Sequence, residues 1–296
     1  MKKVFLLVIA FVTVATFVYS QTTEDTVKVE PKWKLDGVTG INFSQTSLKN
    51  WAGGGENSLA GNAYLNGTLL YKSGKWAWEN NLALDYGLAR TASTGVRKST
   101  DKIDFASKLG YQAKEKLFYT GLFDFKTQFA EGYNYAVTPI KRISNFMAPG
   151  YGTLSLGLDY KPNNNFSLYY SPLAAKFTWV LDDEFSKAGM FGVEAEKRFK
   201  GELGSYLKTV YKLQIMENVD LISKADFFTA YNNSFGNIDV DWDVLLSMKI
   251  NKYLSSTFNA TLRYDDDVDY IDENGVSRGP RVQFRQILGI GLAYKF

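Results

Sequence analysis

The chain contains no cysteine and no histidine among its 296 residues, and only 6 prolines. Without cysteine there is no disulfide, no thiolate metal site and no lipid anchor on a cysteine. Without histidine there is no Ser–His or Asp–His proton relay, and the commonest metal ligand is missing. These absences argue against hydrolases and metalloenzymes. We therefore expect a protein that is not an enzyme and that has no cofactor and no metal centre.

Long hydrophobic runs are missing after the N-terminus. Val4–Val18 follows Lys2 and Lys3 and precedes the small residue Ser20, which predicts a signal peptide cut before Gln21. A membrane anchor is the alternative, but the run is short for a helical span and no positive charges follow it. We expect a signal peptide at 1–20, a tether at 21–32 and one barrel domain at 33–296.

Charge of either sign is close to balance. The predicted signal peptide contains two of the 34 basic residues, so the expected mature chain has 32 basic residues against 31 acidic ones. A chain so near neutrality lacks the basic footprint of a nucleic-acid-binding protein. We therefore expect no nucleic-acid partner.

Apolar residues make up 45% of the chain and aromatic residues 16%, and many of them alternate with polar residues. The clearest segment is Ile238–Ile250, where seven apolar side chains share one face and Asp239, Asp241 and Asp243 share the other. A soluble sandwich would turn its polar faces outward. A membrane barrel turns the apolar faces to lipid and the polar faces to its lumen.

The last strand of the chain favours the membrane barrel. One face is apolar up to the final residue, through Leu288, Ile290, Leu292, Tyr294 and Phe296. A terminal aromatic strand of this kind is typical of bacterial outer-membrane barrels, in which it also serves as the assembly signal. We therefore expect an outer-membrane location, contact with membrane lipid and lipopolysaccharide, and recognition of the strand ending at Phe296 by the barrel-assembly machinery.

The connections between the alternating segments predict the strand number. Five are short and polar, namely 73–75, 114–116, 162–165, 216–218 and 251–253. Six are longer, namely 45–57, 90–100, 131–150, 181–202, 232–237 and 266–281. Counting Met190–Phe199 as a strand gives thirteen, which cannot close with both ends on one side, and that segment is poorly patterned. Placing it in a loop predicts an all-β, closed antiparallel barrel of twelve strands with short periplasmic turns and longer outer loops; fourteen is the alternative.

Two loops carry candidate binding residues. Asn50 and Trp51 precede three glycines and could contact a ligand such as a sugar, or Trp51 could plug the barrel mouth while the glycines turn the chain. The loop 265–273 is rich in carboxylates that could hold Ca²⁺, but its spacing matches no calcium loop, and a solvated loop is the simpler interpretation.

Four stretches of the sequence resemble one protein family. They are 42–45, Asn50-Trp51-Ala52-Gly53-Gly54, 249–255 and 263–266. The chain is similar to a Bacteroidetes family known as a domain of unknown function, number thirty seventy-eight. The resemblance implies an outer-membrane barrel and supplies no catalytic residues.

The lumen predicted from strand alternation is charged, and two hypotheses follow. In the first, Asp239, Asp241 and Asp243 form an acidic stripe that faces Lys208 and Lys212, with Arg263 nearby, along a narrow passage for a small polar or saccharide-like solute. In the second, the charges form salt bridges across a filled barrel, and the outer loops bind a partner, lipopolysaccharide or a glycan.

Overall fold

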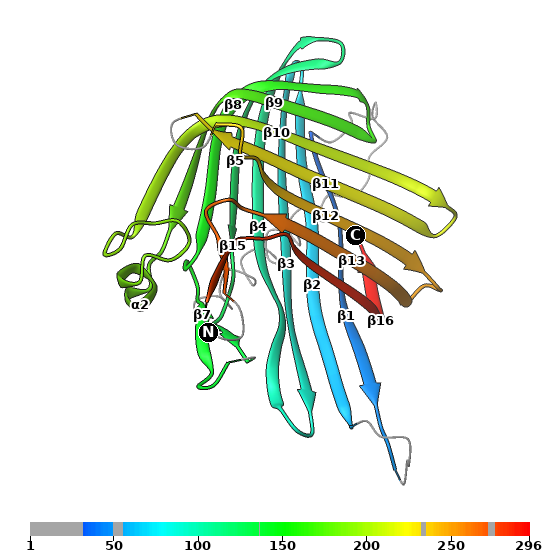
Figure 1. Ribbon diagram of the computed structural model, residues 1–296. Coiled ribbons are helices and arrows are strands. Elements are labelled where there is room, and N and C mark those ends of the chain that lie inside the picture. The colour runs from blue at the N-terminus through cyan, green and yellow to red at the C-terminus, as the bar shows by residue number, and fades with distance from the viewer. Residues whose placement is uncertain (1–31, 50–55, 136, 232–234, 272–275) are drawn as a thin grey trace. The chain divides into compact units, whose positions relative to one another are not determined.

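Twelve antiparallel strands close into a barrel in the part of the chain that the structure, a computed structural model, describes (Figure 1). The described residues are 32–49, 56–135, 137–231, 235–271 and 276–296. The predicted signal peptide and most of the predicted tether lie outside them. The barrel strands are β1 (Trp33–Thr46), β2 (Ser58–Ser73), β3 (Trp76–Thr91), β4 (Gly95–Lys114), β5 (Leu117–Thr127), β8 (Gly150–Asn163), β9 (Phe166–Trp179), β10 (Phe199–Met216), β11 (Val219–Ala230), β12 (Asp239–Lys249), β13 (Leu254–Tyr264) and β16 (Gln283–Lys295).

The ring runs β1-β16-β13-β12-β11-β10-β9-β8-β5-β4-β3-β2 and returns to β1. The first and last strands form the closing seam, with Ile41 opposite Leu292. At the end of the seam, Gly37 N–H donates to the carbonyl of Phe296 at 2.8 Å, and Phe296 N–H donates to the carbonyl of Gly37 at 3.0 Å. Closure leaves no free sheet edge. The prediction of a closed barrel of twelve strands is confirmed.

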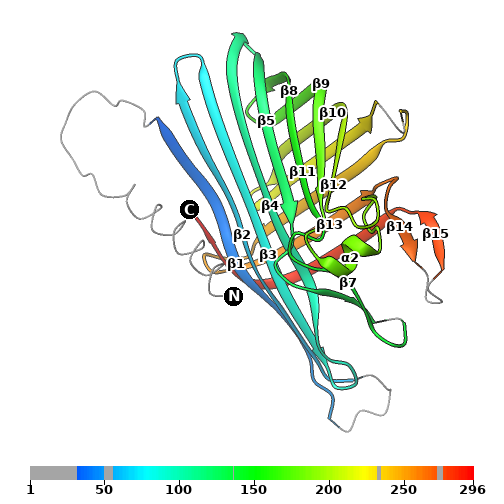
Figure 2. The ribbon, with the colours of Figure 1, turned by 90° about the vertical axis from the view of Figure 1, so that its left-hand side faces the viewer.

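The longer connections hold the smaller elements. The hairpin β6 (Gly132–Asn134) and β7 (Lys141–Ser144) follows β5, the helix α2 (Asp183–Lys187) follows β9, and the hairpin β14 (Asp269–Ile271) and β15 (Ser277–Pro280) follows β13. Figure 2 shows α2, β7, β14 and β15 together on one side of the barrel. Among the described residues, none of the helical segments has the length and apolar character that a membrane-crossing helix requires.

One predicted loop is wrong. Residues 90–100 were expected to form a long loop, but β3 continues to Thr91 and β4 begins at Gly95. The register shifts between Gly87 and Leu88, where the chain has one extra residue, Ser99. Such a bulge breaks the period of two and hides the strand from pattern analysis. Met190–Phe199 does lie almost wholly between β9 and β10, as predicted.

A second irregularity lies at Pro172 in β9. Proline has no N–H to give to the ladder. The pairing with β8 shifts between Leu156 and Leu158, and Ser171 repairs the gap because its hydroxyl donates to the carbonyl of Leu156 at 2.8 Å. The bulge changes which residues face inward: Tyr169 and Ser171 do so before it, and Ala174 and Lys176 after it.

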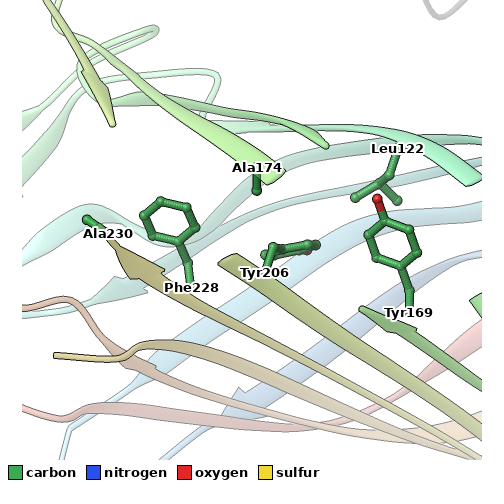
Figure 3. Packing of buried hydrophobic residues seen from close by; sticks show 6 residues of the cluster. All are labelled: Leu122, Tyr169, Ala174, Tyr206, Phe228 and Ala230. Atoms are coloured by element: carbon green, nitrogen blue, oxygen red, sulfur yellow. The ribbon is translucent and has the colours of Figure 1, made fainter. Parts of the chain in front are cut away.

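The two faces of the wall differ in chemistry. Large apolar side chains are exposed on the outside, including Trp242, Leu288 and Ile290. The inside holds a small buried cluster in which Tyr169 and Tyr206 pack edge to face beside Leu122, Ala174, Phe228 and Ala230 (Figure 3). An apolar exterior around a polar interior is the arrangement of a transmembrane barrel.

Candidate functional site

Charged side chains from six strands line a cavity of about 40 Å³ inside the barrel. The cavity has room for about three water molecules. The charged residues that line it are Glu79, Asp104, Asp226, Asp241, Asp243, Lys108, Lys126, Lys208, Lys212 and Lys224. They come from β3, β4, β5, β10, β11 and β12, and each strand contributes every second residue because side chains alternate across a sheet.

Lys126 on β5 is the centre of an ion-pair network. Its Nζ lies 2.8 Å from Asp226 Oδ2 on β11 and 2.9 Å from Asp241 Oδ2 on β12. Lys208 on β10 shares Asp226 at 3.2 Å and also reaches Asp124 on β5 at 2.8 Å. These side chains are mostly buried, so their attraction is screened less than that of a surface pair. The network ties β5, β10, β11 and β12 together through the lumen.

Lys102 bridges opposite walls. It lies on β4, and its Nζ is 2.7 Å from Asp243 Oδ2 on β12, a strand that is separated from β4 by five strands in either direction around the ring. Thr261 Oγ1 holds the other Asp243 oxygen by donating to it at 2.6 Å. A contact between such strands can exist only if side chains span the whole lumen. The interior is therefore crossed by ion pairs at this level.

Further ion pairs lie in the lumen on both sides of the Lys102–Asp243 pair, along the barrel axis. Near the longer connections, Lys176 Nζ lies 2.6 Å from Asp239 Oδ2 and 3.1 Å from Asp265 Oδ2. Toward the short turns, Asp159 Oδ2 lies 3.0 Å from Lys108 Nζ and 3.4 Å from Lys161 Nζ. Lys161 also reaches Glu79 at 3.3 Å. The described lumen is thus filled with ion pairs over much of its length.

The acidic stripe has different partners from those predicted. Asp239 is bound by Lys176, Asp241 by Lys126 and Asp243 by Lys102. Arg263 Nε lies 3.5 Å from Asp241 Oδ1. Neither Lys208 nor Lys212 reaches the stripe; Lys208 binds Asp124 and Asp226 instead, and Lys212 has no carboxylate within 4 Å among the described residues.

Three residues that hold the network at its two ends, Lys176, Asp159 and Lys161, were not predicted from the sequence. Lys176 could not be assigned to the lumen by alternation, because the bulge at Pro172 exchanges the inward and outward positions within β9. Asp159 and Lys161 alternate on β8, and this spacing could have identified them.

A second network of ion pairs joins the longer connections between the strands, outside the lumen. Arg142 lies 3.0 Å from Glu131, 2.8 Å from Asp182 and 2.6 Å from Glu184. Asp182 caps α2 by accepting from the N–H groups of Glu184 and Phe185. A charge-assisted cap of this kind fixes the start of a helix.

Beneath this network lies a second apolar cluster. Ala148, Val180, Phe185 and Val193 are buried together, with Met190 and Phe191 against them. Phe185 and Phe191 meet edge to face with their ring centroids 6.0 Å apart. The connection between β9 and β10 is therefore a packed cap with its own small core.

The cap is expected to loosen at acidic pH. Burial alone would raise the pKa of Asp182, but hydrogen bonds from Asn145 and from the N–H of Phe185, together with the charge of Arg142, hold this pKa below its usual 3.8. Hydrogen bonds from Tyr133 and Arg142 likewise lower the pKa of Glu131. Because the folded pKa values are depressed, the stabilisation is complete above the ordinary carboxyl range and is lost as pH falls through the lowered values.

Hydrogen exchange with mass spectrometry measures this effect. After correction for intrinsic rates, amides of residues 183–198 should lose protection on acidification while those of β4 and β5 keep it. Equal protection of the cap at neutral and acidic pH would contradict the role of these carboxylates.

The loop that carries Asn50 and Trp51 is described only at its ends, and both candidate residues lie outside the described residues. At those ends, Leu48 N–H donates to Asn57 Oδ1 at 2.6 Å, and Glu56 accepts from the N–H of Ser93 at 2.8 Å and from its hydroxyl at 2.9 Å. Glu56, just before β2, is therefore fastened to the β3–β4 turn.

The acidic loop uses several of its carboxylates within the protein. Asp265 binds Lys176 at 3.1 Å, and Asp267 binds Lys200 at 2.7 Å. Asp266 accepts from the amide of Asn237. Across the residues that the structure describes, no group of three or more carboxylates is arranged to hold a metal ion.

Solved structures with a similar fold include several bacterial barrels. An outer membrane channel from Pseudomonas putida F1 is 10% identical, with a TM-score of 0.40, over 93% of this chain and 100% of that chain. The translocator domain of the autotransporter NalP from Neisseria meningitidis is 9% identical, with a TM-score of 0.39, over 99% and 96%. The NanC porin is 7% identical, with a TM-score of 0.38, over 88% and 99%.

No curated protein matches the chain. One family model does match, and it is described as "Protein of unknown function (DUF3078)". The match spans residues 43–133, which begin near the end of β1, include β2 to β5 and end within β6. The resemblance to this family that was predicted from the sequence is thereby confirmed for residues 43–133.

Proposed function

We propose that the protein is an outer-membrane barrel whose interior is a narrow passage for small polar solutes, closed at rest by ion pairs. The apolar and aromatic exterior supports a place in a membrane, where strands such as β12 turn Trp242 to the acyl chains. The chain acts without catalysing a reaction, and its outward contacts are with lipid and lipopolysaccharide. The barrel-assembly machinery recognises the strand that ends at Phe296.

The observation that carries the proposal is a cavity inside the barrel that charged side chains line. Ion pairs in a low-dielectric interior have a large desolvation penalty, and apolar side chains of similar volume often serve stability equally well. A barrel that needs only to be rigid can therefore fill its interior with apolar residues. Charged side chains around a cavity instead suit a path on which a polar solute exchanges its hydration shell for protein groups.

The same ion pairs close the passage. Lys102 and Asp243 meet from opposite walls, and Lys126 joins β5 to β11 and β12 a short distance away. A solute larger than water can pass only when these contacts separate. The solute must therefore be small, and its passage is expected to be intermittent.

Single-channel recording in planar bilayers tests the proposal, with Lys102→Gln as the key variant. Wild-type protein should show small and infrequent openings. Lys102→Gln removes the bridge between β4 and β12, so its openings should be roughly twofold larger and more frequent. Lys75→Gln, a substitution in the exposed turn between β2 and β3, is the matched control and should behave as wild type.

A second function is favoured by a different observation. The packed cap around Arg142 and Phe185 offers an ordered outer surface, as a scaffold barrel that binds a partner, lipopolysaccharide or a glycan would need. In that case the lumen only stiffens the barrel. Electrical silence of both wild type and Lys102→Gln, with a normal heat-dependent gel shift, would reject the passage and favour this second function.

A further inference from the structure

Among the charged side chains that line the cavity inside the barrel, only lysines have no oppositely charged group within 4 Å. Each carboxylate that lines it has a lysine within 4 Å: Glu79 has Lys161, Asp104 and Asp243 have Lys102, and Asp226 and Asp241 have Lys126. Of the five lysines that line it, Lys108, Lys126 and Lys208 are paired. Lys212 and Lys224 have no carboxylate within 4 Å in the described part of the chain. The lining is balanced in total, with five carboxylates and five lysines, but the two charged side chains without a partner within 4 Å are both lysines.

The strand register places these lysines together. Lys224 on β11 lies directly opposite Val210 on β10, and Lys208 and Lys212 are two residues to either side of Val210. All four side chains share the inward face. Diagonal neighbours on one face of an antiparallel pair are about 7–8 Å apart, a spacing at which two ammonium groups can contact one small ion. We call Lys208, Lys212 and Lys224 the lysine patch.

The carboxylates nearest to the lysine patch have other partners. Asp243 lies opposite Lys224 in the β11–β12 register, but it accepts from Lys102 and Thr261. Asp226 lies opposite Lys208 and is shared with Lys126. Lys212 faces Ile222 across the strand pair, which offers it no charge. Local pairing therefore leaves the lysine patch with positive charge that a bound ion can neutralise.

We propose that the lysine patch makes the lumen selective for small anions, in the size range of chloride, formate or acetate. This inference rests on the passage proposed above and specifies which solutes use it. An anion can bind Lys212 and Lys224 without breaking an existing ion pair. Each carboxylate of the lining already has a lysine within 4 Å, so a cation must compete with that lysine. In a site largely shielded from water, this local difference in pairing favours the anion.

Reversal potentials under a potassium chloride gradient test the inference. Wild-type protein is expected to pass chloride in preference to potassium. The double variant Lys212→Gln/Lys224→Gln should lower the chloride-to-potassium permeability ratio roughly fivefold. The double variant Lys212→Arg/Lys224→Arg should keep the wild-type ratio, and Lys75→Gln is the control for a charge lost outside the cavity.

Folding is checked separately, because the glutamine variant leaves no carboxylate without its lysine and should keep the heat-dependent gel shift. Conductance that prefers potassium, or a ratio unchanged in the glutamine variant, would overturn the anion inference and leave the passage intact. Absence of conductance from every variant would overturn both.

Discussion

Lys126→Met is expected to destabilise the folded barrel by about 3–5 kcal/mol. Lys126 is shared by Asp226 at 2.8 Å and Asp241 at 2.9 Å and lies 3.9 Å from Asp124. Methionine has a similar length but no charge, so these carboxylates would remain in a narrow lumen without their shared cation. Removing one partner of a buried ion pair is costly because the other charge stays buried.

Urea unfolding of the refolded protein in liposomes, followed by gel mobility, measures this loss. Lys126→Arg keeps the charge and should retain most of the stability. Lys126→Met combined with Asp226→Asn removes one of the two carboxylates that lose Lys126 and should recover part of the loss, which isolates charge from packing. A change below about 1 kcal/mol in Lys126→Met would mean that the lumen is too well hydrated for its ion pairs to matter.

Gly291→Ala is expected to prevent proper closure of the barrel. Gly291 lies on β16 opposite Asn42, at the seam with β1. An added Cβ would overlap the carbonyl oxygen of Ile41 and lie 2.7 Å from Asn42 Cα. These are backbone atoms of the partner strand, so the clash is relieved only by opening the seam, at a free-energy cost of about 3 kcal/mol or more.

Gly121→Ala is the matched control for this prediction. Gly121 lies in the middle of β5, and its added Cβ would meet only a methyl group of Leu156 at 3.5 Å. In refolding followed by gel shift, Gly121→Ala should give the wild-type yield, while Gly291→Ala should leave most of the protein in the unfolded band. Equal yields from the two variants would show that the β1–β16 seam is not as close as the structure has it.

The barrel could be predicted from the sequence because its strands have to alternate. A strand with lipid on one side and water on the other repeats with period two, and Ile238–Ile250 shows this with Leu245 as its one apolar residue on the polar face. The prediction was wrong where the backbone breaks the period. Ser99 adds a residue to β4, and the residues of the β3–β4 hairpin beyond it were assigned to a loop.

The candidate site could be predicted only in part. Alternation identifies which side chains face inward, but the partners of those side chains depend on the tilt and stagger of a closed sheet. Lys102 and Asp243 are 141 residues apart and meet because β4 and β12 stand on opposite walls. Lys176 was missed because the bulge at Pro172 reverses inside and outside within one strand.

The central claim is that apolar side chains of this barrel face lipid while the charged side chains beside them face the lumen. Trp242 tests it most directly, because it is partly exposed on the outer face of β12 between Asp241 and Asp243. A variant with Trp242 as its sole tryptophan, refolded into liposomes with brominated acyl chains, should lose much of its fluorescence to bromine and almost none to aqueous iodide. Strong quenching by iodide with none by the brominated chains would contradict the claim.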